Sequence, residues 1–303
     1  MKPLLLALCM FLTFASQAQM LNDSPFDARV AQPKYKKGKG PSVLFDKGHH
    51  NFIIEMGLEK PLMDVATADG YQVKVDSMKF TKAYLAPYKM LVIFPAMPFK
   101  FGSKKQVTDE ITFTSEELTA LHDWVSAGGS LLMFNEHAPI DKSVTPLFNK
   151  FGIQLSIGIV SDSIHYDASI KMKSKQGFLK FTRSNGLLNT DHPITQGEKA
   201  GEQINTIVTF GGGGLTGEKY TNIFKLSPSA IIVKHNGIEP SGTANSQALA
   251  GKFGKGKVVA LGDCNGFTAM YMMSGGNKIS AGMQLPEYDW KQFALNTFHW
   301  LSK

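Results

Sequence analysis

Four short runs of apolar residues constrain the fold of this chain more than any other feature of its sequence. They occupy residues 42–45, 90–94, 130–134 and 258–261. None of them alternates apolar with polar residues, as a strand with one face in water does, and each is too short for a helix that spans a core. Strands covered on both faces have this pattern. We therefore predict that the four runs lie side by side in one parallel sheet.

Segments with helical periodicity separate these predicted strands. Residues 53–68 and 143–151 are predicted helices, and a third helix is expected after Thr114, a residue that caps helix N-termini well. The chain closes on a predicted helix at about 287–301. Strands that alternate with helices indicate an α/β fold, in which helices cover both faces of a mainly parallel sheet.

The second half of the chain has a different pattern. Residues 164–181 alternate apolar and polar side chains, which predicts an antiparallel hairpin or meander, and further strands are predicted at 230–233 and 248–250. We expect this antiparallel β-rich extension, at about 155–250, to lie on the parallel sheet or as a flap beside it. Residues 41–303 would then form a single domain.

Two conspicuous sequence features in this half receive structural interpretations. Residues 211–214 are four consecutive glycines. Because no basic residue adjoins them, the run favours a flexible loop over a cradle for an anion. Asp191 and His192 precede a proline, and this context favours a turn over a catalytic pair.

The N-terminus has the features of a secretory signal peptide over residues 1–19. Lys2 gives a positive start, an apolar core follows, and residues 16–18 form a small-x-small cleavage signal. Cys9 lies inside the apolar core and follows a leucine, so it does not fit a lipoprotein signal. We expect an exported protein, periplasmic or secreted, whose mature chain begins near Gln19.

Export bounds the chemistry and the partners of the mature chain. Cys264 would be its only cysteine, so an internal disulfide is excluded and burial must hold the fold together. Part of the net charge of +7 lies in a lysine-containing lead-in at residues 20–40, which we interpret as an extended, solvated linker. We expect no nucleic-acid partner, and no segment after the signal peptide is apolar over the roughly 20 residues that span a bilayer. The sequence leaves the oligomeric state open.

Five segments, in this order, resemble one known superfamily. They are residues 42–46, 88–93, 130–137, 191–197 and 254–263. They resemble the class I glutamine amidotransferase-like superfamily, and within it exported, non-amidotransferase members such as trehalose-utilisation-like proteins. The resemblance covers roughly residues 42–301 and implies a flavodoxin-like fold. The end of the signal peptide also resembles that of a bacterial protein of the Bacteroidota.

One departure from the superfamily decides the expected activity. A glutamine amidotransferase needs a cysteine on the turn after the strand at 130–134, activated by a histidine. Here that turn holds Asn135, Glu136 and His137, and Cys264 follows a different strand. We therefore predict that amidotransferase activity is absent, and we interpret Cys264 as an inert, packed thiol.

Polar side chains follow three of the predicted buried strands. These three groups are Asp46, His49, His50 and Asn51; Asn135, Glu136 and His137; and Asp263, Cys264 and Asn265. Parallel strands end at one edge of a sheet, where α/β folds bind their ligands. Imidazoles with carboxylates bind divalent metals or serve as general acids and bases. The spacings match no specific metal motif, so no cofactor is predicted and a divalent metal stays open. The alternative is that these residues cap helices and satisfy loop amides.

Three functions agree with this pattern. The first is an exported amidotransferase-like domain that binds a small polar ligand; the resemblance and the export signal imply a sugar or glycan fragment. Its ligand-binding residues would be Asp46, His49, His50, Asn51, Asn135, Asp263 and Asn265. The second is a hydrolase that uses Glu136 with His137, His49 or His50. The third is a non-catalytic protein–protein scaffold of the cell envelope. We predict that His49, His50, Glu136 and Asp263 converge at the carboxyl edge of the sheet, because each follows a buried strand within a few residues.

Overall fold

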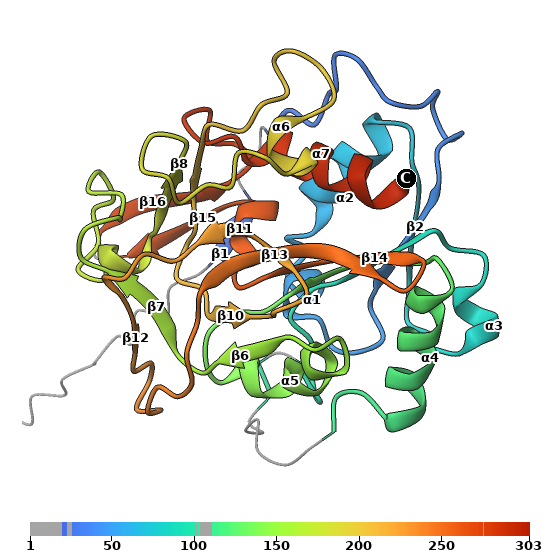
Figure 1. Ribbon diagram of the computed structural model, residues 1–303, viewed down its shortest axis with the longest axis horizontal. Helices are drawn as coiled ribbons and strands as arrows, with labels where there is room; N and C mark the ends of the chain where they lie inside the picture. Colours follow the sequence, from blue (N-terminus) through green and yellow to red (C-terminus); the bar gives the residue numbers. More distant parts are fainter. Residues whose placement is uncertain (1–19, 23–25, 101, 104–110, 275) are drawn as a thin grey trace, which may run out of the picture.

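The computed structural model describes residues 20–22, 26–100, 102–103, 111–274 and 276–303 (Figure 1). The expected signal peptide at residues 1–19 lies outside these described residues. No helix in the described ranges is long and apolar enough to cross a membrane.

The five parallel strands of the central sheet have a defined order. β2 (Ser42–Asp46) lies between β3 (Gln72–Asp76) and β4 (Met90–Ile93), and β4 is followed by β5 (Ser130–Phe134) and β14 (Gly256–Leu261). All neighbours in this series pair in parallel. The four predicted strands therefore lie side by side, as expected. Counted along the chain, the order is 2-1-3-4-5, which is the flavodoxin-like order.

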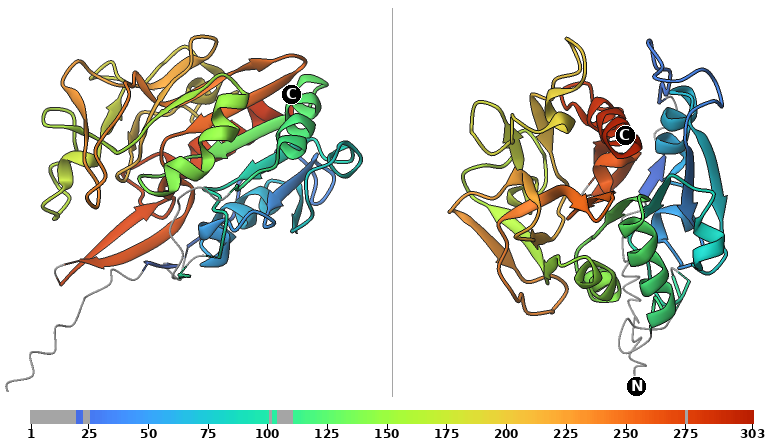
Figure 2. Two further views of the ribbon diagram at one scale, coloured as in Figure 1. Left: turned by 90° about the horizontal axis from the view of Figure 1, so that it is seen from below. Right: turned by 45° about the vertical axis from the view of Figure 1, so that its right-hand side comes forward.

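The β-rich extension continues the same sheet beyond β14. β13 (Ser246–Phe253) pairs antiparallel with β14, and β10 (Gly214–Thr216) and β6 (Gln154–Ser156) follow it toward the edge. β11 (Thr221–Lys225) also pairs with β13. The prediction of an antiparallel extension on the parallel sheet is thus confirmed, and Figure 2 shows it beside the parallel strands.

The predicted antiparallel pairing within residues 164–181 is limited to the two ends of the segment, where Tyr166 and Leu179 form an isolated antiparallel bridge. The regular strands on either side pair elsewhere: β7 (Ile159–Asp162) pairs with β12 (Ala230–Val233), and β8 (Lys180–Thr182) pairs with β9 (Thr206–Val208). Between the two bridge residues lies a short 3₁₀ helix, η1 (Lys175–Gly177). Asp167 fixes this segment by accepting hydrogen bonds from Ser169 and from the Tyr288 hydroxyl. Tertiary contacts therefore override the local alternation.

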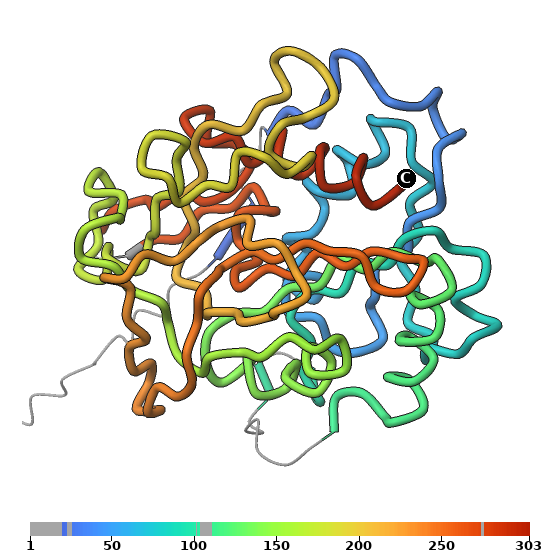
Figure 3. Tube along the Cα trace, viewed as in Figure 1, coloured from blue at the N-terminus to red at the C-terminus, as the bar shows by residue number. Residues whose placement is uncertain are grey.

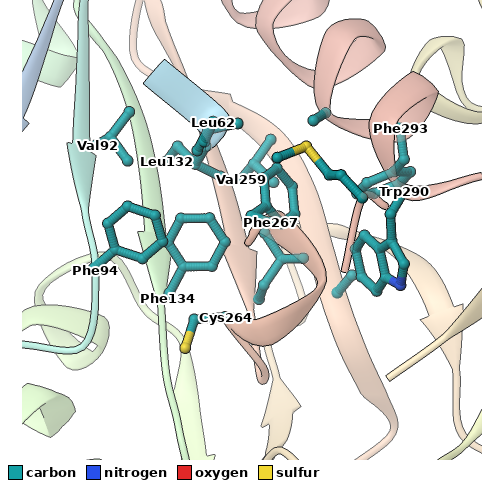
Figure 4. Packing of buried hydrophobic residues seen from close by; sticks show 14 of the residues in the cluster. Leu62, Val92, Phe94, Leu132, Phe134, Val259, Cys264, Phe267, Trp290 and Phe293 are labelled. Carbon is teal, nitrogen blue, oxygen red and sulfur yellow. The ribbon is translucent and has the colours of Figure 1, made fainter. Parts of the chain in front are cut away.

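Helices cover both faces of the sheet. α4 (Ser115–Ser126) and α5 (Ile140–Lys150) contribute Leu121 and Leu147 to the core on one face. On the other face, α2 (Lys60–Ala68) and α7 (Trp290–Ser302) pack with the side chains of Phe94, Phe134, Phe267 and Trp290 (Figure 4). The remaining helical segments are short: α1 (Phe52–Glu55), α3 (Lys82–Leu85), α6 (Pro193–Gln196) and the 3₁₀ helix η2 (Asn265–Phe267).

Two helix predictions can be compared with these bounds. The predicted helix at 53–68 is divided into α1 and α2, because Gly57 adopts a φ of 71°, which ends a helix. The cap of α4 is as expected: the Thr114 hydroxyl accepts from the Glu117 amide, and the Glu117 carboxylate accepts from the Thr114 amide.

A second, three-stranded sheet was not predicted. It consists of β1 (Met20–Asn22), β15 (Ala269–Ser274) and β16 (Asn277–Gly282). The lead-in after β1 runs over the surface toward α2 and α7 (Figure 3), where the Lys34 amide donates to the Asp69 carboxylate. Lys291 on α7 donates to the backbone carbonyls of Asp27 and Arg29 and so fixes the lead-in.

Candidate functional site

The polar residues at the carboxyl edge of the sheet fall into two clusters. We call the group around His49, after β2, the histidine cluster, and the group around Glu136, after β5 and β14, the carboxyl cluster. Within the described ranges, no hydrogen bond or ion pair joins the two clusters. His50 belongs to neither, because its Nδ1 lies 2.8 Å from Glu55 on α1. The expected contact of His49 and His50 with Glu136 is therefore not formed.

Both ring nitrogens of His49 are occupied in the histidine cluster. Nδ1 lies 3.0 Å from Asp46 Oδ2, and Nε2 lies 3.1 Å from Glu117 Oε1. The ring packs between Phe80 and Phe113, with centroid distances of 4.7 and 4.6 Å. Asn51 completes the group by donating its Nδ2 to Asp46 Oδ2 over 2.9 Å. His49 thus has no ring nitrogen free for a ligand or a metal.

The charges of this cluster favour an imidazolium between two carboxylates. Burial opposes protonation of His49, but the hydrogen bond and charge of Asp46, together with Glu117, outweigh it and raise its pKa. Burial would raise the pKa of Glu117, but the Thr114 amide and His49 lower it. Sequence reasoning placed Glu117 only in the helix cap. The position of Glu117, in the first turn of a helix beside the sheet edge, is the sequence feature that points to its contact with His49.

The carboxyl cluster joins the ends of β5 and β14. Glu136 Oε2 accepts from the Cys264 thiol and from Asn265 Nδ2, both over 3.1 Å. Asp263 Oδ1 accepts from the amide and the Nδ2 of Asn265, each over 2.8 Å, and its Oδ2 accepts from the Phe210 amide over 2.6 Å. All of these side chains are buried, and Cys264 is 0% exposed. The sequence-predicted residues Glu136, Asp263 and Asn265 therefore do meet.

Burial dominates the protonation of this cluster. It raises the pKa of Glu136 well above the usual value, and the charge of Asp263 adds to the effect. It also raises the pKa of Asp263. Burial and then the charge of Glu136 raise the pKa of Cys264 well above that of a free thiol. Burial thus favours the protonated forms of both carboxyl groups, and it favours the thiol form of Cys264 over a nucleophilic thiolate.

His137 connects the carboxyl cluster with solvent. Its side chain is 33% exposed, and its Nε2 lies 3.8 Å from Glu136 Oε1. Nδ1 donates to the Ala138 carbonyl over 2.9 Å, so Nε2 is the ring nitrogen left for contact with Glu136. The ring of His235 stacks on it at a centroid distance of 3.9 Å. Burial, and then His137, lower the pKa of His235 to about 4.

His235 was missed because nothing in its own sequence context indicates a site. It follows β12 in the extension, and only the pairing of β12 with β7 brings that turn to the end of β5. An imidazole far away in the chain cannot be assigned to a cluster from spacing alone.

The glycine segment, residues 211–214, covers this edge and is not the flexible loop that was predicted. Gly213 donates its amide to the Gly262 carbonyl over 2.8 Å. A Cβ on Gly212 would lie 2.3 Å from that carbonyl oxygen, and one on Gly213 would lie 2.6 Å from Asn135 Nδ2. Glycine is therefore required for close approach to β14 and β5. Beneath it, Asn135 is 0% exposed, and neither of its amide atoms has a partner among the described residues.

We expect Gly212→Ala to lower the free energy of unfolding by about 1–3 kcal/mol, the usual cost of overpacking. The new methyl group would meet the Gly262 backbone, which cannot rotate away. Gly177→Ala is the matched control, since its Cβ would meet a flexible side-chain methyl of Ile159 at 3.3 Å. Urea denaturation of both variants measures the difference, and equal losses would contradict the close packing of this segment.

A wide groove lies away from both clusters. It has a volume of about 950 Å³ and lies between the lead-in (Phe26 to Gln32), residues 199–202 and the segment before and along α7. Its lining includes His299, whose Nε2 is held by Asp69 over 2.6 Å. None of the sequence-predicted site residues lines it. The predicted turn at Asp191 and His192 is confirmed, because His192 Nδ1 accepts from the Ile194 amide and caps α6.

Comparison with known proteins shows a similar fold and does not identify a function. No family model and no curated protein matches this chain. The mmIFT52 N-terminal domain is similar with a TM-score of 0.55 at 15% identity, over 86% of this chain and 97% of that one. A putative ThuA-like protein from Bacteroides uniformis has a TM-score of 0.44 at 12% identity, over 91% and 94%. A putative GMP synthase protein from Thermoplasma acidophilum has a TM-score of 0.43 at 10% identity, over 87% and 94%. The first match shows a shared fold, and the identities are too low to transfer a function.

Proposed function

We propose that this protein is an exported, amidotransferase-like domain that binds a small polar ligand at the ends of β5 and β14. The observation that carries the proposal is Asn135, which is fully buried under the glycine segment with both amide atoms unpartnered among the described residues. A buried amide without partners is costly, and a polar ligand would supply them. The resemblance to trehalose-utilisation-like proteins supports a sugar or glycan fragment as that ligand.

The binding proposal is tested by a thermal-shift screen of mono- and oligosaccharides, followed by calorimetry on each hit. A ligand that binds only the folded protein raises the thermal midpoint in proportion to its concentration relative to Kd. We expect the shift to disappear in Asn135→Ala and to remain in Asn189→Ala, whose amide serves the backbone of β11. A shift that both variants retain would place the ligand elsewhere.

A hydrolase is the second candidate, favoured by the contact of His137 with Glu136. A carboxyl group whose pKa is raised by burial, next to an imidazole, can serve in general acid–base catalysis, and His137 is exposed enough to reach substrate. An assay of glycoside and ester hydrolysis distinguishes the two candidates. Turnover by the wild-type protein that is lost in His137→Ala would favour the hydrolase.

A protein–protein scaffold is the third candidate. Leu21 and Met273 are exposed on the three-stranded sheet, at 37% and 44%. Leu21 pairs with Tyr271, and Met273 lies two residues further along the same face. A small apolar surface of this kind favours a protein partner.

Glutamine hydrolysis should be undetectable in this protein. No cysteine follows β5, and Cys264 is a buried thiol that donates to Glu136. Ammonia release from glutamine would be compared between wild type and Cys264→Ala, and both should match the rate without protein. Activity lost in Cys264→Ala would identify Cys264 as the nucleophile and contradict this assignment.

Export predicts where the mature chain begins. N-terminal sequencing of the protein from its native host should find a start near Gln19, just before β1. An intact Met1, or a lipid on Cys9, would overturn the export proposal.

A further inference from the structure

The carboxyl cluster places three potential metal-ligand atoms close together. One atom each from Glu136, Asp263 and Cys264 lies within 4.8 Å of the other two, and all three side chains are buried. The Cys264 sulfur is 3.1 Å from Glu136 Oε2. Ligand atoms around a tetrahedral zinc ion are about 3.5 Å apart, given bond lengths of roughly 2.0–2.3 Å. The spacing of the cluster is close to that of a coordination shell.

Asn265 provides an independent indication of a bound group. It is 6% exposed, and its Oδ1 has no partner among the described residues, although its Nδ2 bridges Glu136 and Asp263. The oxygen and nitrogen of an amide exchange places by a half-turn of the side-chain amide. Turned in this way, Asn265 would point Oδ1 at the space between the carboxylates. It would then offer a fourth ligand atom in place of the two hydrogen bonds that its Nδ2 donates, and a cation would take over the contacts to both carboxyl groups.

The hydrogen-bond donors around the two carboxyl groups carry no formal charge, and the His137 ring, which can be protonated, lies 3.8 Å from Glu136 Oε1. In the described part of the chain these donors are the amides of His137, Phe210 and Asn265, with the Asn265 side chain and the Cys264 thiol. None of them is a lysine or an arginine. Buried carboxylates are normally paired with a cation or coordinate a metal. The backbone amides also fix the carboxylate orientations, as outer hydrogen bonds do at metal sites.

We propose that Glu136, Asp263, Cys264 and Asn265 bind one divalent cation of the zinc class. This inference deepens the proposed function and rests on the same site, because the cation would form the floor on which a polar ligand sits. A thiolate among oxygen ligands selects zinc or cobalt over magnesium and calcium, which take oxygen alone. On binding, the Cys264 S–H bond breaks, its proton passes to solvent and the sulfur lone pair forms the bond to the metal.

The test uses Zn²⁺ and Co²⁺ alone as probes. The ligand atoms lie under the glycine segment, so metal is removed from the unfolded chain. The protein is unfolded in denaturant with a chelator present, and after removal of the chelator it is refolded with either metal. We expect one cobalt per chain, with a thiolate-to-cobalt charge-transfer absorption band and release of protons on binding. Cys264→Ser should lose the band, and Glu136→Gln should weaken the affinity at least about tenfold. Asp141→Asn is the matched control, since this buried acid serves the Gly158 amide, and it should bind like wild type.

A second pair of variants keeps the test decisive if Cys264→Ser does not fold. Asn265→Asp adds a charged oxygen ligand and should tighten cobalt binding, whereas Asn265→Ala should weaken it. Folded wild-type protein without the band, or a band retained in Cys264→Ser, would overturn the metal site. The proposed function fails separately. Metal binding without any sugar-induced thermal shift rejects the sugar ligand, and a sugar-induced shift in metal-free protein rejects the cation as the floor of the ligand site.

Discussion

His49→Ala is expected to lower the free energy of unfolding by about 3–5 kcal/mol, the usual effect of removing one partner from a buried ion pair. The imidazole is 6% exposed and lies between Asp46 and Glu117, whose side chains are 0% and 6% exposed. Its loss would leave two buried carboxylates facing each other without the cation and would also open space between Phe80 and Phe113. Urea denaturation at neutral pH measures the loss.

The matched control is His122→Ala on the surface of α4. His122 also contacts an acid, Asp123, at 2.9 Å, but their side chains are 38% and 65% exposed. An exposed pair contributes about 0–1 kcal/mol, so this variant should remain close to wild type. Similar losses in the two variants would mean that the histidine cluster is not the ion network that its geometry indicates.

The pH dependence of His49→Ala carries a definite sign. The pKa of His49 is raised in the folded protein above its usual 6.5, so the folded state binds this proton more tightly. The resulting stabilisation is complete below pH 6.5 and is lost as pH rises through the folded pKa. The difference in stability between wild type and His49→Ala should therefore shrink on the alkaline side. Glu117 acts oppositely: its lowered pKa stabilises above pH 4.5, and this contribution is lost as pH falls through the folded pKa.

The parallel core was predictable because double-sided burial leaves a local mark. β2, β4, β5 and β14 each contain an unbroken run of three or four apolar residues, so each can be recognised without knowing its neighbours. The change from apolar to polar residues also marked the end of each strand, and so identified the first residues of the two clusters. The three-stranded sheet of β1, β15 and β16 left no such mark, because its strands are short or partly exposed.

The partners within each cluster could not be predicted, because they depend on tertiary placement. The sequence shows His49 and Glu136 after buried strands, and parallel topology suggests that they meet. The structure instead supplies Glu117 from α4 to His49, and Cys264 and Asn265 to Glu136. The glycine segment shows the same limit: glycine indicates freedom in the chain, but here it permits a contact too close for any Cβ.

Glu136→Gln is expected to abolish ligand binding while leaving the thermal midpoint nearly unchanged. Burial raises the pKa of Glu136 and so favours its neutral form, and glutamine replaces it with a neutral amide of the same shape. The remaining Oε of glutamine can still accept from Asn265 and Cys264, as Glu136 does. Glutamine cannot donate an acidic proton and cannot become negatively charged. A ligand, a substrate or a cation would depend on one of these two properties of Glu136.

The reciprocal control is Asp162→Asn at the end of β7. Asp162 is also buried, but it accepts from Ser227, Ser229 and the His165 amide, which hold its pKa well below the usual range despite burial. Replacing this ionised carboxylate should cost stability and leave binding intact. If Glu136 has only a structural role, Glu136→Gln should behave in the same way. Its free energy of unfolding should fall by on the order of 1 kcal/mol, with ligand binding preserved. Calorimetry and thermal denaturation therefore distinguish the two roles of Glu136. A binding residue loses ligand binding and keeps its thermal midpoint, whereas a structural residue keeps ligand binding and loses stability.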